Sequence, residues 1–310
     1  MIAAQFQSSG DLIADRRVEW ARDSVARNDF VAAAEVLAQA LERVPGYAAG
    51  WFMLGETRDR LGDQDGAIAA FTRARASDPQ DRYGAALHLV RLGAASTAAM
   101  PQAYVQTLFD GYASRFDRAL TQTLRYRGPE ILLDTVRRTC GLERAGGCFS
   151  SMLDLGCGTG LGGAAFRPFA DRIVGVDLSA AMLAQARAKG IYERLAQDDA
   201  VAFLHDEAAA GERYDLILAA DVLIYFDDLA PVACAAACSL REGGSVAFTV
   251  ETHDGEGALL RDTLRYAHGR DTVRAAIADA GLTLLLLEDA SLRTEKGVPV
   301  AGLVCVATTG

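Results

Sequence analysis

The chain has 310 residues, 51% of them apolar, and its 41 acidic and 31 basic side chains give a net charge of −10. This length fits one large domain or two ordinary ones with a sizeable core. Only two of the bases are lysines and no run of five like charges occurs, so a nucleic-acid backbone is not an expected partner.

The sequence also lacks the usual marks of an exported, membrane-spanning or metal-binding protein. Its six cysteines and four histidines show no metal-ligand spacing. The N-terminus has no basic start followed by an apolar core, and no uncharged apolar stretch is long enough to span a bilayer. We therefore expect a cytoplasmic protein with reduced thiols, no membrane contact and no bound metal.

The first part of the chain repeats with a period of 34 residues. In the second copy, GWFMLGETRDRLGDQDGAIAAFTRARASDP, small residues let two antiparallel helices approach closely, and Pro79 ends the second helix. The matching pairs are Ala33 and Ala67, Leu37 and Phe71, Ala40 and Ala74, and Pro45 and Pro79. The pattern resembles the tetratricopeptide repeat. A weaker first copy runs from about Leu12 to Pro45, and a helix after Pro79 reads as a cap.

A short array of two repeats and a cap has two possible uses. Arrays of this type usually bind a peptide or a partner protein in their concave groove. Alternatively, the helices pack against the rest of the chain or form a dimer contact. The sequence leaves both open.

A helical stretch follows the small, polar junction AASTAAMPQ (94–102). Leu108, Tyr112, Phe116 and Leu120 recur every four residues and form one apolar stripe. Pro129 breaks the pattern, and a second helix is predicted from Glu130 to about Cys140.

From Met152 onward, apolar strands alternate with helices, which implies a parallel sheet covered on both faces. The strand candidates are SMLDL, RIVGVD, a short piece near RLAQ, YDLILAAD, GSVAFTVE, GLTLLLLED and VAGLVCVA. The last two are joined only by ASLRTEKGVP, too short for a helical crossover, so they should pair antiparallel. The predicted fold is α/β, a mostly parallel seven-stranded sheet with a C-terminal antiparallel hairpin, preceded by the all-α repeats.

Between the first strand and its helix lies LDLGCGTGLGG (153–163), with five glycines in eight positions. Glycine lets backbone N–H groups come close to a ligand, and such a loop typically holds a nucleotide-like cofactor. Gly158, Gly160 and Gly163 satisfy the dinucleotide pattern GxGxxG, and Asp177 lies near the distance of its ribose-binding acid. Glycine spacing alone therefore does not identify the cofactor.

Three features favour S-adenosylmethionine (SAM). At the end of the first strand, Asp154 is favourable beside an ammonium and a sulfonium and would repel a pyrophosphate. Asp177, in GVDLS, stands where a carboxylate can accept both ribose hydroxyls. QDDAVAFL offers an acid and a backbone N–H for adenine, and YDLILAADVLIYF places Asp221 and Tyr225 on the same rim, where ligands bind in such sheets.

Taken in order, DLGCGTG, GVDLS, DDA, ADVLIYF and the closing hairpin resemble the class I SAM-dependent methyltransferases, which have a Rossmann-like fold. The resemblance covers about residues 105–310, and the whole chain is similar to bacterial methyltransferases that carry tetratricopeptide repeats before the catalytic domain. It implies a repeat domain at 1–95, linker and lid helices at 96–145, and a SAM-binding methyltransferase domain at 146–310.

The resemblance also implies roles for single residues. The glycines of the loop would line the methionine part of SAM, with Asp154 near its amino group through the loop or water, and Asp177 would hold the ribose. Asp199, favoured over its neighbour Asp198, and Ala200 would touch adenine, with Met182 packing on its face. The implied cofactor-binding set is Asp154, Gly156, Cys157, Gly158, Gly160, Asp177, Leu178, Met182, Asp199, Ala200, Asp221 and Tyr112.

Methyl transfer in this family rests on alignment of an acceptor lone pair with the S–CH₃ bond, and a base helps only if the acceptor is a hydroxyl. The predicted catalytic residues are His268, His253 and Tyr225. Arg265 and Arg270, around His268, suit an acceptor carboxylate. The alternative is a helix-start cluster with a solvated histidine. In FDGYASRFD, Tyr112 is assigned to a lid and Phe116 to the core.

The leading functional hypothesis is a methyltransferase acting on a small molecule, free or held by a carrier protein. The second is a protein methyltransferase whose repeats recruit the polypeptide substrate. The third is a SAM-binding scaffold that works through its repeats without catalysis. A dinucleotide enzyme is the least favoured.

Overall fold

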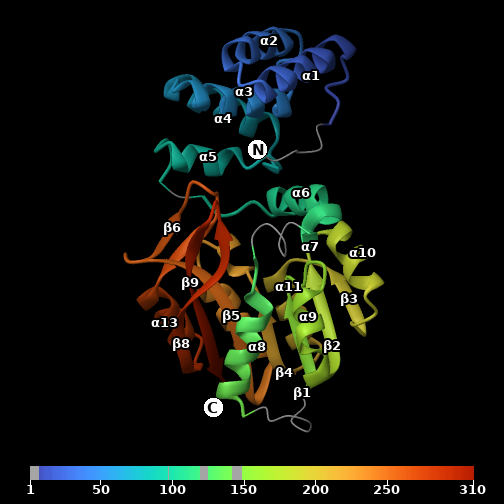
Figure 1. The fold of residues 1–310 in the computed structure, drawn as a ribbon, viewed down its shortest axis with the longest axis vertical. Helices are drawn as coiled ribbons and strands as arrows, with labels where there is room; N and C mark the ends of the chain where they lie inside the picture. The colour runs from blue at the N-terminus through green and yellow to red at the C-terminus, as the bar shows by residue number, and fades with distance from the viewer. Residues whose placement is uncertain (1–6, 97, 119–124, 142–148) are drawn as a thin grey trace. The chain divides into compact units, whose positions relative to one another are not determined.

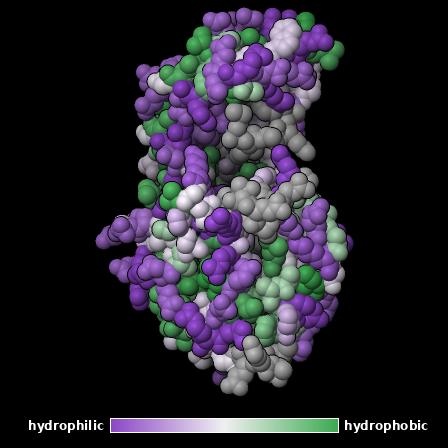
Figure 2. Space-filling view, viewed as in Figure 1, coloured by the Kyte–Doolittle hydropathy of each residue, from purple (hydrophilic) through white to green (hydrophobic). Residues whose placement is uncertain are grey.

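The computed structural model describes residues 7–96, 98–118, 125–141 and 149–310. The chain forms two compact units, Met1–Gly111 and Tyr112–Gly310 (Figure 1). Leu120, the last residue of the predicted apolar stripe, and the predicted boundary at 145/146 lie outside the described residues. On the face shown in Figure 2, hydrophilic residues predominate, with hydrophobic ones scattered between them, as is normal for a protein surface.

The first unit is helical. Its elements are α1 (Leu12–Ala26), α2 (Phe30–Arg43), α3 (Ala48–Leu61), α4 (Gln64–Ser77), α5 (Ala85–Arg91) and most of α6 (Gln102–Tyr112). No helix in the described part of the chain is both long and apolar enough to cross a membrane.

The 34-residue period appears in the packing of this unit. Helix α1 packs on α2 and α3 packs on α4, and the repeated apolar positions of α2 and α4 are buried. Asp29 and Asp63, also 34 residues apart, cap α2 and α4 with their carboxylates. A Cβ atom at Gly55 would lie 2.7 Å from the Phe71 ring, so only glycine allows α3 and α4 to come this close. The predicted helix after Pro79 is α5.

The second unit is a nine-stranded sheet with helices on both faces (Figure 1). Its strands are β1 (Phe149–Leu155), β2 (Ala170–Asp177), β3 (Arg194–Gln197), β4 (Tyr214–Ala219), β5 (Leu240–His253), β6 (Ala258–Leu260), β7 (Tyr266–Gly269), β8 (Thr283–Glu295) and β9 (Val298–Thr308). Its α-helices are α7 (Phe116–Arg118), α8 (Gly128–Thr139), α9 (Leu161–Phe166), α10 (Ala180–Ala188), α11 (Ala200–Ala209), α12 (Ala230–Ser239) and α13 (Arg270–Asp279).

The strand pairing confirms the predicted parallel sheet and its closing hairpin. Strands β3, β2, β1, β4 and β5 lie side by side and are parallel. Strand β9 then pairs antiparallel with β5 on one side and with β8 on the other. The hairpin is tighter than ASLRTEKGVP indicated, because both strands extend into that segment. Only Lys296 and Gly297 separate them, at φ +50° and +82°, as a two-residue hairpin turn requires.

The predicted fold class is confirmed, but the sheet has nine strands where seven were predicted, because no strand was predicted between residues 253 and 283. Strand β9 pairs with β5 only as far as Glu251. The last residues of β5 continue past this point and pair in parallel with β7, which in turn pairs with β6. These two strands are short, so their sequences carry little periodicity.

The helical stretch predicted from residue 105 is also shorter than expected. Helix α6 ends at Tyr112 and is followed by a 3₁₀ turn, Ala113–Arg115, and by the single turn α7. The second predicted helix is confirmed as α8, with Pro129 in its first turn, where proline is tolerated.

The two faces of the sheet bury separate clusters of apolar side chains. Leu216 and Leu218 of β4 face α8 and α9, whereas Ile217 and Ala219 face α11, α12 and α13. This alternation along β4 follows from the two-residue period of a strand. Because both faces of the sheet are covered by apolar packing, polar side chains gather at the carboxyl ends of the strands.

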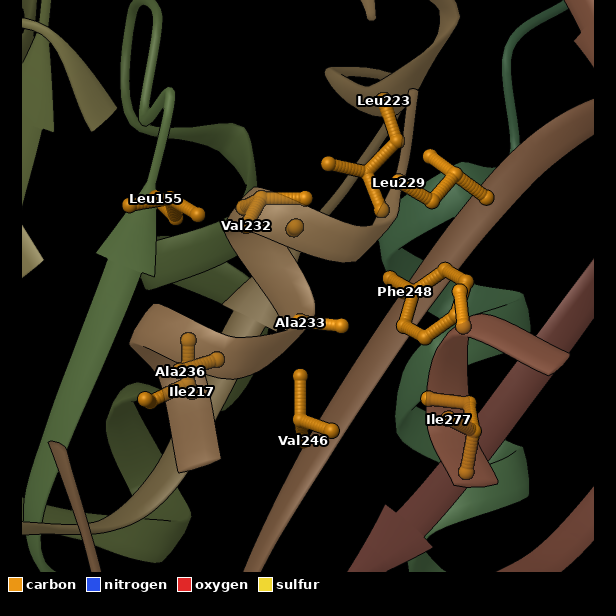
Figure 3. A pocket seen from close by; sticks show the side chains of 12 residues that line it. Leu155, Ile217, Leu223, Leu229, Val232, Ala233, Ala236, Val246, Phe248 and Ile277 are labelled. Carbon is orange, nitrogen blue, oxygen red and sulfur yellow. The ribbon is translucent and has the colours of Figure 1, made fainter. Parts of the chain in front are cut away.

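A cavity lies within the second of these clusters, between α12, α13 and the sheet (Figure 3). Its lining is entirely aliphatic or aromatic and includes Leu155, Val232, Phe248 and Ile277. Because it offers no hydrogen-bonding side chain, this cavity is a gap in core packing and does not fit a polar cofactor.

Candidate active site

The glycine loop connects β1 to α9 through three residues with positive φ. These are Gly156, Gly158 and Gly160, at +64°, +53° and +89°. A Cβ atom at Gly156 would lie 2.4 Å from the Val222 side chain, whereas one at Gly158 would meet only the Phe116 ring, at 3.8 Å. The loop therefore needs glycine for its backbone shape and leaves room beside Gly158.

Asp177, at the end of β2, holds this loop from the neighbouring strand. Its carboxylate accepts hydrogen bonds from the backbone N–H groups of Gly158 and Ser179, each at 2.8 Å. The N–H of Cys157 donates to the carbonyl of Val176 at 2.9 Å, so the buried Cys157 belongs to the loop framework. Asp177 remains partly exposed.

Asp154 lies deeper than the sequence analysis expected, with an exposed fraction of 2%. Its Oδ2 accepts hydrogen bonds from the Gly163 N–H at 2.8 Å and from the Tyr192 hydroxyl at 2.6 Å. Burial raises the pKa of Asp154 to about 6, against the opposite effect of these two hydrogen bonds. Tyr192 was not among the predicted site residues.

The residues expected beside adenine flank the ends of β2 and β3. Asp199 caps α11 by accepting from the N–H groups of Val201 and Ala202, each at 3.0 Å, and Ala200 is the first residue of that helix. The Leu178 carbonyl accepts from the Gln197 side chain.

Met182, in α10, was predicted to pack on the adenine face, and this role stays a prediction. It is fully buried and presents no exposed surface to a ligand in this structure.

The segment that follows α6 within the second unit is tied to the glycine loop by Asp117. The Thr159 hydroxyl donates to one oxygen of the Asp117 carboxylate, and the Lys189 ammonium of the α10 segment pairs with the other at 3.0 Å. Tyr112 and Phe116 pack edge to face, with ring centroids 5.8 Å apart.

Phe116 does not join the core, which corrects its predicted role. It is partly exposed and directs its ring toward Gly158. Asp117 and Thr159 were missed by the sequence analysis, because nothing local marks a contact across 42 residues.

Six charged side chains meet at the other end of the site, and we name them the arginine cluster. They are Asp221, Glu251, Arg261, Arg265, Arg293 and Glu295.

Arg293, in β8, lies at the centre of this cluster with a side chain only 1% exposed. It pairs with Asp221 at 2.6 Å, with Glu295 at 3.0 Å and with Glu251. Asp221 has φ +60°, and its N–H donates to the Thr249 hydroxyl at 2.9 Å. The cluster thus holds a strained residue at the carboxyl end of β4.

Tyr225 follows Asp221 in a 3₁₀ turn, Leu223–Tyr225, and is partly exposed. Burial raises the pKa of its hydroxyl, while Arg265 hydrogen-bonds to it and partly offsets this effect. Tyr126, just before α8, is also affected by Asp221 and Arg293, and burial raises its pKa well above the usual value. Both hydroxyls therefore stay protonated at neutral pH.

The two histidines that were predicted to be catalytic both make contacts within the fold. His268 lies in β7 with an exposed fraction of 0%, and its Nε2 is 3.4 Å from the Leu223 carbonyl. Burial lowers its pKa, so the ring is neutral and enclosed. His253 accepts from the Gly255 N–H through Nδ1 and donates to the Gly257 carbonyl through Nε2, so both of its nitrogens stabilise the turn after β5.

Arg270 likewise makes contacts that stabilise the fold. It pairs with Asp289 at 2.6 Å and donates to the Leu287 carbonyl at 3.1 Å. Of the two arginines predicted to bind an acceptor carboxylate, only Arg265 lies in the arginine cluster. Within the described ranges, no group of three or more histidine, cysteine or acidic side chains is arranged to hold a metal ion.

The residues around the glycine loop fit SAM better than a dinucleotide. Asp154 has no basic partner among the described residues. A ligand that brings an ammonium and a sulfonium supplies the missing positive charge, whereas a diphosphate adds repulsion. The room beside Gly158 and the partly exposed Asp177 carboxylate supply, in addition, the cradle and the hydroxyl acceptor that a nucleoside needs.

Comparisons with known proteins agree with this reading. The family model of a methyltransferase domain matches residues 153–246, and that of a tetratricopeptide repeat matches residues 18–82. A comparison of the sequence with curated proteins finds no match.

Two solved structures share the fold of the second unit. The Burkholderia thailandensis 1,6-didemethyltoxoflavin-N1-methyltransferase is 19% identical with a TM-score of 0.51, over 69% of this chain and 92% of that one. The magnesium protoporphyrin IX methyltransferase of Synechocystis PCC 6803 is 15% identical with a TM-score of 0.50, over 67% of this chain and 99% of that one. With the two family models and the charge of the site, these observations make the chain a SAM-dependent methyltransferase of the class I fold that carries tetratricopeptide repeats before its catalytic domain.

Proposed function

We propose that this methyltransferase acts on a small-molecule acceptor, either free or held by a carrier protein. The observation that carries the proposal is the tie between Asp117, Thr159 and Lys189, which fastens the aromatic segment 112–118 to the glycine loop. A segment held there narrows the approach to the cofactor, and a narrow approach favours a small acceptor over the surface of a folded protein.

The cofactor would be held by the residues around the glycine loop. We assign the ribose hydroxyls to Asp177, the ammonium group to Asp154, and the adenine edge to Asp199 and the N–H of Ala200. When bound, SAM supplies a methyl group on a positively charged sulfur. The protein's part is to bind it, exclude water and orient the acceptor, and such positioning accounts for much of the rate in a transfer of this kind.

The acceptor would lie on the side of Tyr225. Arg265 hydrogen-bonds to the Tyr225 hydroxyl and holds the phenol beside the arginine cluster. The raised pKa of Tyr225 opposes a role as base, so we assign it a positioning role. The neutral balance of the arginine cluster, three guanidinium groups against three carboxylates, provides no surplus charge for an anionic acceptor.

A protein acceptor recruited by the repeats is the second candidate. It is favoured by α1, whose Leu12 and Trp20 are 86% and 55% exposed. The two residues are eight positions apart and share one face of the helix. In this case residues 1–95 would bind the substrate protein and 96–145 would connect it to the catalytic domain.

One labelling experiment separates the two. The full chain is incubated with methyl-tritiated SAM and a bacterial lysate, and the products are divided into small molecules and acid-precipitable protein. Label among small molecules, or label released from protein by neutral hydroxylamine as expected for a carrier thioester, supports the proposal. Label that stays on protein after this treatment, and is lost when Leu12 and Trp20 are both replaced by serine, would establish the second candidate instead.

A further inference from the structure

Tyr192 lies between α10 and β3, and its ring occupies a space bounded by three glycines. A Cβ atom would lie 3.0 Å from the Tyr192 ring at Gly160, 2.4 Å from its hydroxyl at Gly163 and 2.9 Å from its ring at Gly175. Gly160 and Gly163 flank the first turn of α9, and Gly175 is in the middle of β2. Any larger residue at Gly163 or Gly175 would collide with this ring, and at Gly175 it would also meet the Leu195 side chain at 2.8 Å.

The hydroxyl of Tyr192 ends on the carboxylate of Asp154, at 2.6 Å. The same oxygen, Oδ2, accepts the Gly163 N–H at 2.8 Å. One carboxylate oxygen therefore joins the loop before β3, the end of β1 and the first turn of α9. A buried carboxylate with two donors on one oxygen has a fixed rotamer.

We propose that Tyr192 is a positioning residue for the cofactor: its ring sets the path of the glycine loop, and its hydroxyl fixes the Asp154 carboxylate for the ammonium group of SAM. The inference rests on the cofactor assignment made above. It also gives Gly163 and Gly175 a role that differs from cofactor contact, because they make room for a tyrosine.

This geometry predicts that ligand binding depends on pH. The pH dependence distinguishes a positioning role of Tyr192 from a role in packing alone. The titratable groups that act on Asp154 are Asp177, Cys157, Tyr192 and Tyr126, and none of them is cationic. Binding of an ammonium group therefore favours the ionised carboxylate and releases a proton when the pH is near the pKa of Asp154, about 6. The tyrosine hydroxyl favours the same ionised form, and its removal should raise that pKa.

The test uses S-adenosylhomocysteine, which keeps the ammonium group, and isothermal titration of the full chain from pH 5.5 to 8.5. For the unmodified protein the affinity should rise with pH and level off above about pH 7. If the lost hydrogen bond raises the pKa of Asp154 by about one unit, Tyr192→Phe should bind about fivefold more weakly at pH 6 and equally well at pH 8.5. Gly175→Ala, which crowds the ring from β2, should shift the profile in the same direction.

Tyr214→Phe is the matched control, because Tyr214 also donates to a carboxylate in this unit, that of Glu207, outside the proposed cofactor site. It should leave the pH profile of binding unchanged. An unchanged profile in both Tyr192→Phe and Gly175→Ala overturns the proposal, as does a loss of affinity that is equal at every pH. If the unmodified protein does not bind S-adenosylhomocysteine at any pH, the cofactor assignment is wrong. The role of Tyr192, which depends on that assignment, is then wrong as well.

Discussion

The carboxylate of Asp177 accepts the backbone N–H of Gly158 at 2.8 Å, so the end of β2 fixes the middle of the glycine loop. Replacing Asp177 with alanine removes this bond and the group that we assign to the ribose hydroxyls. We expect SAM to bind at least 100-fold more weakly, since each hydrogen bond to a charged group is worth about 1.5–3 kcal/mol. Isothermal titration and the thermal shift with SAM measure the loss.

Asp171→Ala is the control for this variant, because Asp171 is exposed near the opposite end of the same strand. It should keep the SAM affinity of the unmodified protein. A full thermal shift with Asp177→Ala would contradict the assignment of the ribose to this residue.

The tie at Asp117 predicts a kinetic effect on the cofactor. Lys189→Met removes the ion pair between the ammonium group and the Asp117 carboxylate, so the segment 112–118 should open more often. We expect S-adenosylhomocysteine to dissociate about two- to fivefold faster, consistent with a partly exposed ion pair worth about 1 kcal/mol or less. Stopped-flow displacement measures the rate. Arg187→Met, which replaces an exposed base on the same helix, should leave the dissociation rate of S-adenosylhomocysteine unchanged. An equal increase in both variants would contradict a role of the Asp117 ion pair in holding the segment.

The sequence was sufficient to predict the repeats, the parallel sheet, the closing hairpin and the glycine loop, because each depends on a local pattern. A 34-residue period, alternating strands and helices, and clustered glycines are all visible without knowledge of contacts. The short strands β6 and β7 were missed because three or four residues carry too little pattern.

The site partners were missed for a different reason. Tyr192 reaches Asp154 across 38 residues, and Arg293 reaches Asp221 across 72. A single sequence contains no direct signal for such pairs. The one available signal for Tyr192 was indirect, in that Gly163 and Gly175 are small at positions where neither a turn nor a positive φ requires glycine. The burial of His268 could not be predicted either, because its neighbours in sequence are charged.

We expect disruption of the arginine cluster to reduce the unfolding free energy strongly. Arg293→Met leaves Asp221, Glu251 and Glu295 without their common partner, and Glu251 is itself buried. Removing one partner from a buried ionic network costs about 3–5 kcal/mol of unfolding free energy. Urea unfolding followed by circular dichroism measures the change. Arg138→Met, which breaks an exposed pair with Glu288, should cost less than about 1 kcal/mol, and similar costs for the two variants would contradict a structural role for the cluster.

The burial of His88 predicts how the stability of the repeat unit depends on pH. It is stacked on Phe71 with ring centroids 4.5 Å apart and is 9% exposed, and burial, with help from Arg91, lowers its pKa to about 4. Between pH 6.5 and 4 the unfolded chain binds a proton that the folded chain does not, so stability falls as the pH decreases across this window. The loss should total about 3 kcal/mol, given 1.36 kcal/mol for each pKa unit.

Replacing His88 with glutamine should remove this part of the pH dependence, whatever it does to the stability at pH 7. The measurement is the difference in unfolding free energy between variant and unmodified protein at several pH values, because carboxylates that titrate in the same range then cancel. That difference should shrink as the pH falls from 6.5 to 4, since only the unmodified protein pays to keep its histidine neutral. His205→Gln, at an exposed position of α11, should show a constant difference, and a constant difference for His88→Gln would mean that the ring is protonated without cost in the folded repeat unit.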